Sequence, residues 1–122
     1  ATTCDTGYRL ARQAVEEDRL PEAFFVTNDS MAIGAFRALR EAGVRVPDDV
    51  AVIGCNDIPA AAYLSPTLST VRLRTDIMGI MAVRLLRDRV QHERDMGVHL
   101  VVPSELVVRD SSCRNVVSEV AT

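Results

Sequence analysis

Short apolar runs alternate with amphipathic segments along this chain. The runs at residues 23–26 and 50–53 are continuous, a pattern typical of strands that are covered on both faces of a sheet. Between them, residues 31–42 carry apolar side chains at helical spacing, and Gly43 suits the left-handed position that follows a helix. This order predicts a β–α–β unit with parallel strands and a right-handed crossover.

The rest of the chain continues this alternation of helices and strands. The pattern predicts a helix over residues 6–18 capped by Thr3 or Asp5, a short helix from Pro59, a strand over 68–73, a helix over 76–92 capped by Asp76, and extended runs over 98–102 and 105–108. We expect the residues from 110 onward to be loosely ordered. Together the elements predict an α/β fold with a parallel sheet between helical layers, a three-layer α/β/α arrangement.

The predicted helix over residues 76–92 has a wide apolar face for an outer helix. Its members are Ile77, Ile80, Met81, Val83, Leu86 and Val90. We expect this face to be made for packing against a part of the protein that this chain lacks. In the isolated chain, we expect it to be buried by a neighbouring chain or by a rearranged contact.

Both central strands are followed by a carboxamide and a carboxylate. Asn28 and Asp29 follow the first strand, and Asn56 and Asp57 follow the second. The carboxyl ends of parallel strands meet at one edge of a sheet, where ligands bind in α/β proteins. We therefore expect a binding site at this edge. The alternative is that these residues cap helices or form turns, which favour the same residue types.

The composition excludes several classes of function. The chain has 122 residues, a net charge of −3 and no basic block, so it has no electrostatic footprint for nucleic acid. Its three cysteines are widely spaced, which favours reduced thiols in the cytoplasm over a disulfide framework. No apolar run approaches the roughly 18 residues that a membrane helix needs, and no signal peptide is visible. His92 and His99 lack further ligands nearby in sequence, so neither a metal site nor a cofactor is predicted.

Four segments resemble lac-repressor-type bacterial transcription regulators. They are FFVTNDSMAIGA (24–35), RVPDDVAVIG (45–54), LSTVR (68–72) and PSELVVRDS (103–111), and they follow one another in the order found in that family. The resemblance implies a partial, periplasmic-binding-protein-like carboxyl-terminal lobe of an effector-binding region. It assigns residues 1–73 to the second lobe, 74–110 to a crossover helix and final strand, and 111–122 to a flexible tail.

The resemblance also implies roles for individual residues. Asn28 matches a position that hydrogen-bonds the effector, which the resemblance implies is a sugar or a related small polar metabolite. Asn56 stands where the family usually has an Asp, and Leu73 stands where many relatives carry a polar residue. Asp29 and Asp57 are further candidates for effector contact. The residues that match the subunit interface of a homodimer, with core packing as the alternative, are Ile33, Phe36, Tyr63 and Leu64.

The function implied is that of the sensor and dimerisation part of a cytoplasmic transcription regulator. Operator DNA would be bound only through an amino-terminal domain that, like the first lobe, is absent from this chain. Two other classes compete with this interpretation. One is a solute-binding protein of a sugar transporter, which shares the fold. The other is a small enzyme that uses Asp29 and Asp57 as acid and base, although no nucleophile–base pair accompanies them.

Overall fold

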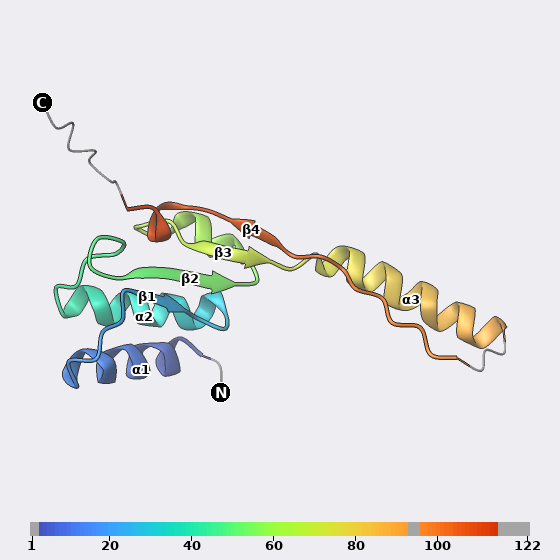
Figure 1. The fold of residues 1–122 in the computed structure, drawn as a ribbon, viewed down its shortest axis with the longest axis horizontal. Coiled ribbons are helices and arrows are strands. Elements are labelled where there is room, and N and C mark those ends of the chain that lie inside the picture. Colours follow the sequence, from blue (N-terminus) through green and yellow to red (C-terminus); the bar gives the residue numbers. More distant parts are fainter. Residues whose placement is uncertain (1–2, 93–95, 115–122) are drawn as a thin grey trace, which may run out of the picture.

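The computed structural model describes residues 3–92 and 96–114. The elements, in chain order, are α1 (Cys4–Glu16), β1 (Ala23–Phe25), α2 (Asp29–Glu41), β2 (Ala51–Cys55), the 3₁₀ helix η1 (Pro59–Tyr63), β3 (Ser69–Arg72), α3 (Thr75–Gln91), β4 (Glu105–Val107) and the 3₁₀ helix η2 (Asp110–Ser112). Figure 1 shows that they form a body from which α3 projects. Of the tail predicted to be flexible, residues 115–122 lie outside the described part of the chain.

The strands form one mixed sheet in the order β1-β2-β3-β4. β1 pairs with β2 and β2 with β3 in parallel, which confirms the parallel β–α–β prediction. β4 runs antiparallel to β3, with Arg72 opposite Glu105. The chain leaves the sheet at the end of β3 and returns to it at the start of β4. Residues 98–102, predicted to form an extended run, form no strand.

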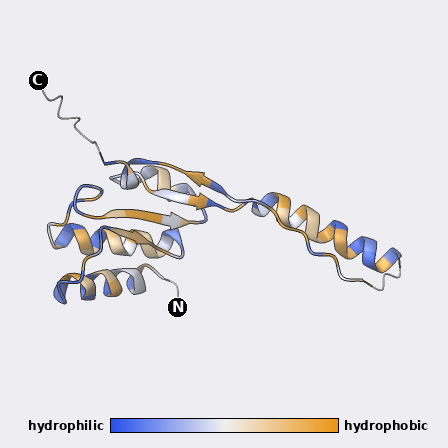
Figure 2. Ribbon diagram, in the orientation of Figure 1, coloured by the Kyte–Doolittle hydropathy of each residue, from blue (hydrophilic) through white to orange (hydrophobic). Residues whose placement is uncertain are grey.

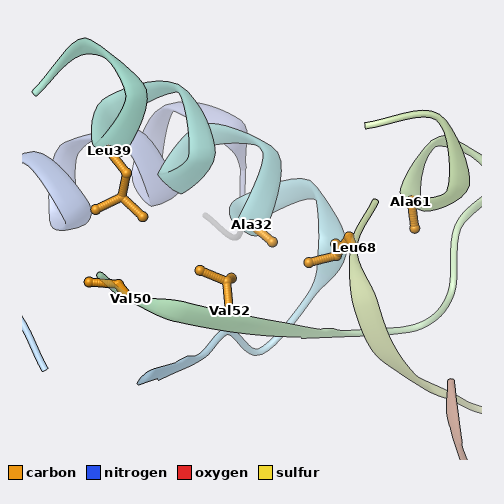
Figure 3. Close-up of a cluster of buried hydrophobic side chains, with 6 residues drawn as sticks. All are labelled: Ala32, Leu39, Val50, Val52, Ala61 and Leu68. Carbon is orange, nitrogen blue, oxygen red and sulfur yellow. The ribbon is translucent and has the colours of Figure 1, made fainter. Parts of the chain in front are cut away.

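The core lies between the sheet and α2. Leu39 and Ala32 of α2 face Val50 and Val52 in Figure 3, and Leu68 and Ala61 complete the buried cluster. α1 packs on the far side of α2, so both helices cover one face of the sheet. On β1, Phe25 is 66% exposed, so the prediction that this strand is covered on both faces is wrong for the described residues. The second outer layer of a three-layer arrangement stays a prediction.

The helix ends follow local side-chain chemistry, with one exception. Thr3 caps α1 by accepting a hydrogen bond from the Thr6 amide, as predicted. Gly43, with a φ of 72°, takes the left-handed position after α2. Asp76 does not cap α3: it lies within the first turn, and the N-cap position belongs to Arg74 without a side-chain cap bond.

The end of the described chain is ordered by burial, which corrects the prediction of a loose segment from residue 110. η2 contacts β2 and β3, and Ser111 is fully buried. The Ser111 hydroxyl donates to the Val52 carbonyl at 2.6 Å and accepts from the Ser69 amide at 2.8 Å. Ser111 thereby satisfies two backbone groups of neighbouring strands, which would be costly to leave unpaired in the interior.

α3 and the segment that returns from it form a projection with little burial. No residue of α3 is buried, and apolar residues lie along it in Figure 2. Leu100 and Val102 of the returning segment line shallow hollows together with α3 residues, so the two run side by side. The apolar face predicted from the sequence is therefore only partly covered: Ile77 and Met81 are half-buried beside the returning segment, whereas Ile80, Val83, Leu86 and Val90 are exposed. Among the described residues, no contact within the chain buries the whole face.

Candidate functional site

Two asparagines reach the same edge of the sheet. Phe25 of β1 pairs with Ile53 of β2 in parallel register, and Asn28 and Asn56 each follow three residues later. Two neighbouring parallel strands therefore deliver both carboxamides to the carboxyl edge of the sheet, where α/β proteins bind ligands. We call the residues 28–29 and 56–57 the rim.

Asn28 caps helix α2 with its side-chain oxygen and leaves its side-chain nitrogen available as a hydrogen-bond donor. It is half-buried and caps α2, its Oδ1 accepting a hydrogen bond from the Met31 amide at 2.8 Å. Its amide nitrogen makes no hydrogen bond within the described ranges. The cap and the predicted ligand contact are therefore compatible, because they use different atoms of one carboxamide.

Asn56 is exposed and has an unusual backbone. Its φ is 109°, and that of Asp57 is 52°, values that residues other than glycine seldom adopt. Such conformations cost on the order of 1–3 kcal/mol each and persist only where the surroundings hold them. Here the Asn56 amide donates to the Val71 carbonyl at 2.9 Å, and the Asp57 amide donates to Thr70 Oγ1 at 3.3 Å.

Asp29 is the fully buried member of the rim. Its Oδ1 accepts from the Thr70 hydroxyl at 2.7 Å, and its Oδ2 accepts from the Ile58 amide at 2.9 Å. The carboxylate thus links the start of α2 both to the segment that follows β2 and to strand β3. Its predicted alternative role, as a helix cap, belongs to Asn28 instead.

Gly54 leaves the room that Asp29 needs. A Cβ atom added at Gly54 would lie 2.1 Å from Asp29 Oδ1, well inside van der Waals contact. Only glycine at this position of β2 lets the buried carboxylate approach the strand.

Asp57 is held by two arginines. Its Oδ2 accepts from Arg72 Nε at 2.7 Å and its Oδ1 from Arg109 Nη2 at 2.8 Å, while its side chain is 11% exposed. Burial raises the pKa of this carboxyl, but the hydrogen bonds from Arg109 and Arg72 outweigh burial and lower it below its ordinary value. The prediction that Asp57 caps the helix at Pro59 is wrong, since the N-cap of η1 is Ile58.

The state of these two carboxylates does not favour acid–base catalysis. Both Asp29 oxygens accept hydrogen bonds inside the protein. The lowered pKa of Asp57 keeps it charged, whereas a general acid needs a pKa raised towards neutrality.

Sequence reasoning missed Thr70, Arg72 and Arg109 as partners of the rim. Thr70 and Arg72 face it from β3, and Arg109 follows β4, so their proximity depends on the pairing of distant strands. The sequence held one signal for these partners: Arg72 and Arg109 lie in two of the four segments that resemble the family. Leu73, which stands where many relatives carry a polar residue, follows β3 directly and is exposed.

The four predicted interface residues lie together on another surface. Ile33, Phe36, Tyr63 and Leu64 all line one open groove of about 780 Å³ between α2, η1 and the loop before β2. We call it the α2–η1 groove. Tyr63 is 87% exposed there. At its border Arg45 donates hydrogen bonds to Asp49, which lower the pKa of that carboxyl to about 2.

Comparison with known proteins places this geometry in a family. A model of the periplasmic binding protein-like domain matches residues 2–112. The chain is 47% identical over 105 residues to the transcriptional repressor MelR of Bacillus subtilis, a match that covers 86% of this chain and 30% of MelR. It is 42% identical over 108 residues to a lactose operon repressor of Rhizobium radiobacter, with 88% of this chain and 95% of that sequence covered.

Solved structures agree with the sequence relatives. The lac repressor dimer bound to operator and an anti-inducer superposes with a TM-score of 0.85 at 31% identity, covering 92% of this chain and 39% of that one. The complex of the regulator CelR with cellobiose gives a TM-score of 0.83 at 37% identity, covering 90% and 34%. The chain belongs to the periplasmic-binding-protein-like family of LacI-type transcription regulators.

The match identifies the region as well as the family. The chain corresponds to the effector-binding domain of these regulators, which favours the regulator over the solute-binding protein of a transporter. It spans about a third of MelR, although nearly all of the Rhizobium radiobacter sequence. Among the described helices, none is long and apolar enough to cross a membrane.

Proposed function

We propose that this chain senses a small neutral carbohydrate through Asn28 and Asn56 and forms a homodimer through the α2–η1 groove. The observation that carries the sensor role is the delivery of two carboxamides to one sheet edge by neighbouring parallel strands. A carboxamide both donates and accepts hydrogen bonds, as a sugar hydroxyl does. The cellobiose complex of CelR supports a sugar as the class of effector.

The two acidic residues of the rim take a supporting part in this proposal. Complete burial of Asp29 supports a role in holding the rim rather than in touching the effector. Asp57 retains some exposure, but its oxygens already accept from Arg72 and Arg109. A rim whose exposed groups are amides offers no charge-assisted bonds, so we expect a neutral ligand and moderate affinity.

The regulator as a whole would act by a population shift. An effector changes the balance between two arrangements of the protein only by binding one of them more tightly. Operator DNA would be contacted by the region of the longer relatives that this chain does not match, and the protein would work in the cytoplasm, where that DNA lies. The lac repressor structure, a dimer on its operator, supports both parts of this proposal.

Side-chain amides offer a direct test of the sensor role. The isotope-labelled chain is titrated with cellobiose and with lactose, and the NMR signals of the side-chain amides are followed. We expect the Asn28 and Asn56 signals to shift with one of the sugars, and Asn28→Ala or Asn56→Ala to weaken binding about tenfold. Gln13→Ala, which removes an exposed amide on α1, is the control and should bind as the wild type does.

Two NMR outcomes would contradict the proposal. If both asparagine signals stay in place at sugar concentrations that shift other parts of the chain, the rim is not the binding site. If the spectrum does not change with either sugar, the proposal that the effector resembles these carbohydrates is wrong.

A further inference from the structure

Ion pairs connect the rim to the base of the α3 projection. We call the base the neck: residues 73–74, which lead from β3 into α3, and residues 103–104, which lead back into β4 (Figure 1). Arg72 is the last residue of β3 and Glu105 is the first of β4, and they stand opposite one another in the sheet. The neck therefore begins and ends at this pair.

Arg72 bridges the neck and the rim. Its Nε donates to Asp57 Oδ2 at 2.7 Å, and its Nη1 donates to Glu105 Oε2 at 3.1 Å. One guanidinium thus contacts the loop that carries Asn56 and the strand that returns from α3. The planar fork of arginine can hold two carboxylates in fixed directions, which a lysine ammonium does not.

Arg109 holds the other side of the same carboxylate. Its Nη2 donates to Asp57 Oδ1 at 2.8 Å and its Nη1 to the Leu68 carbonyl at 2.7 Å. The side chains of Arg109 and Asp57 are 19% and 11% exposed, so their charges are largely removed from water. Separating the two side chains would leave each charge poorly solvated. This cost disfavours movement of Asp57 away from Arg109.

The loop that receives these contacts requires support. Asn56 and Asp57 both have φ values in the left-handed region, which asparagine and aspartate adopt more readily than other non-glycine residues but still at a cost. The backbone amide of Asn56 is held by the Val71 carbonyl, and that of Asp57 by the Thr70 hydroxyl, both from β3. Arg72 and Arg109 add a constraint on the Asp57 side chain, next to Asn56.

We propose that Arg72 is a positioning residue that holds Asn56 in its ligand-binding arrangement through Asp57 and couples the rim to the neck through Glu105. Its role in effector binding rests on the proposed sensor function. A ligand that prefers one arrangement of the loop then changes the constraint on the neck, and a change at the neck alters the affinity of the rim by the same factor. The α3 projection would thereby respond to the effector.

The first arm of the test needs no ligand. Amide hydrogen exchange is measured by NMR in the wild-type chain, in Arg72→Gln and in the control Arg12→Gln. Arg12 is exposed like Arg72, 55% against 41%, and is also paired with an acid, Glu16, but it lies on α1 and contacts neither the rim nor the neck. We expect the Asn56 and Asp57 amides to exchange about tenfold faster in Arg72→Gln and at the wild-type rate in Arg12→Gln.

Two further measurements separate positioning from general loss of structure. The Ala42 and Val44 amides, which bond to the Ala38 and Leu39 carbonyls at the carboxyl end of α2, should keep their wild-type exchange rates in Arg72→Gln. Asp57→Asn, changed at the rim, should speed exchange of the Thr75 amide at the neck, where it donates to the Leu73 carbonyl. Unchanged Asn56 exchange in Arg72→Gln overturns positioning, and unchanged Thr75 exchange in Asp57→Asn overturns the coupling.

The second arm uses cellobiose and lactose. We expect the affinity of Arg72→Gln for the sugar that the wild type binds to be about tenfold lower than that of the wild type. Arg72→Lys should recover part of the loss, and Arg12→Gln should bind normally. Wild-type affinity in Arg72→Gln would overturn the role in binding. If the wild type binds neither sugar, the sensor proposal fails for these ligands, while the exchange measurements still decide the positioning and the coupling.

Discussion

Asp29 shows how a single buried carboxylate can organise three segments of a chain. It accepts hydrogen bonds from the Thr70 hydroxyl and from the Ile58 amide, and Gly54 provides the space in which it lies. A buried polar group of this kind stabilises only when its partners are all present. Its neighbour Asn28 can then face outward from a fixed position at the start of α2.

The space at Gly54 gives a test by substitution. Gly54→Ala should lower the free energy of unfolding by about 2–4 kcal/mol, because the added methyl group collides with a carboxylate that cannot leave without losing its partners. Gly79→Ala is the matched control: nothing lies within 4 Å of its Cβ position in α3, so it should be neutral or stabilise by up to about 1 kcal/mol. Urea denaturation measures both. Equal effects would show that Gly54 is not crowded.

Asp57 gives a pH dependence of known sign. Its pKa is lowered in the folded chain by Arg109 and Arg72 despite burial, whereas an unfolded Asp titrates near a pKa of about 3.9. The stability that it contributes is therefore present above about pH 4 and is lost as the pH falls through the folded pKa. The difference in unfolding free energy between the wild type and Asp57→Asn should shrink between neutral pH and about pH 3. A difference that grows on acidification would contradict the ion-pair assignment.

At the scale of elements, α2 serves two surfaces at once. Its buried face packs Ala32 and Leu39 against the sheet, while its amino end presents Asn28 at the rim. Ile33 and Phe36 line the α2–η1 groove, where η1 contributes an exposed Tyr63, and Phe36 also packs against the buried cluster. One helix thus connects the candidate ligand site and the candidate subunit interface without an intervening loop.

Dimerisation through this groove can be tested at its most exposed residue. Tyr63→Glu should raise the dissociation constant of the homodimer at least about tenfold, because a charge would replace an aromatic side chain of the kind that often anchors interfaces. Leu10→Glu, at an exposed apolar position on α1, is the control and should not change association. Sedimentation equilibrium reports both. A wild-type chain that stays monomeric at about 100 μM, or unaltered association in Tyr63→Glu, would refute the assignment.

At the scale of the whole molecule, the α3 projection sets this chain apart from a self-sufficient domain. The body buries an apolar core, but α3 buries no residue and exposes Val83, Leu86 and Val90. Exposed apolar surface of this extent usually marks a contact with another part of a protein. We propose that it packs against the region of the longer relatives that this chain does not match.

Amide exchange can test that packing. In a full-length regulator, α3 amides should exchange about a hundredfold more slowly than in this chain, equivalent to roughly 2.7 kcal/mol of added local stability. Amides of α2, which is already packed in the body, serve as the reference and should change far less. Equal exchange of α3 in both proteins would mean that its apolar face remains uncovered.

Much of this fold follows from local sequence patterns, because they act over one or two helical turns. The spacing of apolar residues predicted α2, Thr3 chose the start of α1, and Gly43 ended α2 by its tolerance of positive φ. Continuous β-branched runs predicted β2, and the carboxyl-end rule brought Asn28 and Asn56 to one edge.

Only the tertiary structure decided which groups meet across distant segments. Three contacts join residues more than 12 positions apart, and no local pattern encodes them. They are Asp57 with Arg109, Asp29 with Thr70, and the buried Ser111 with Val52. The same holds for exposure: the apolar face of α3 and the open side of Phe25 look like core in sequence. Burial depends on what a residue packs against, and that is a property of the assembled molecule rather than of the segment.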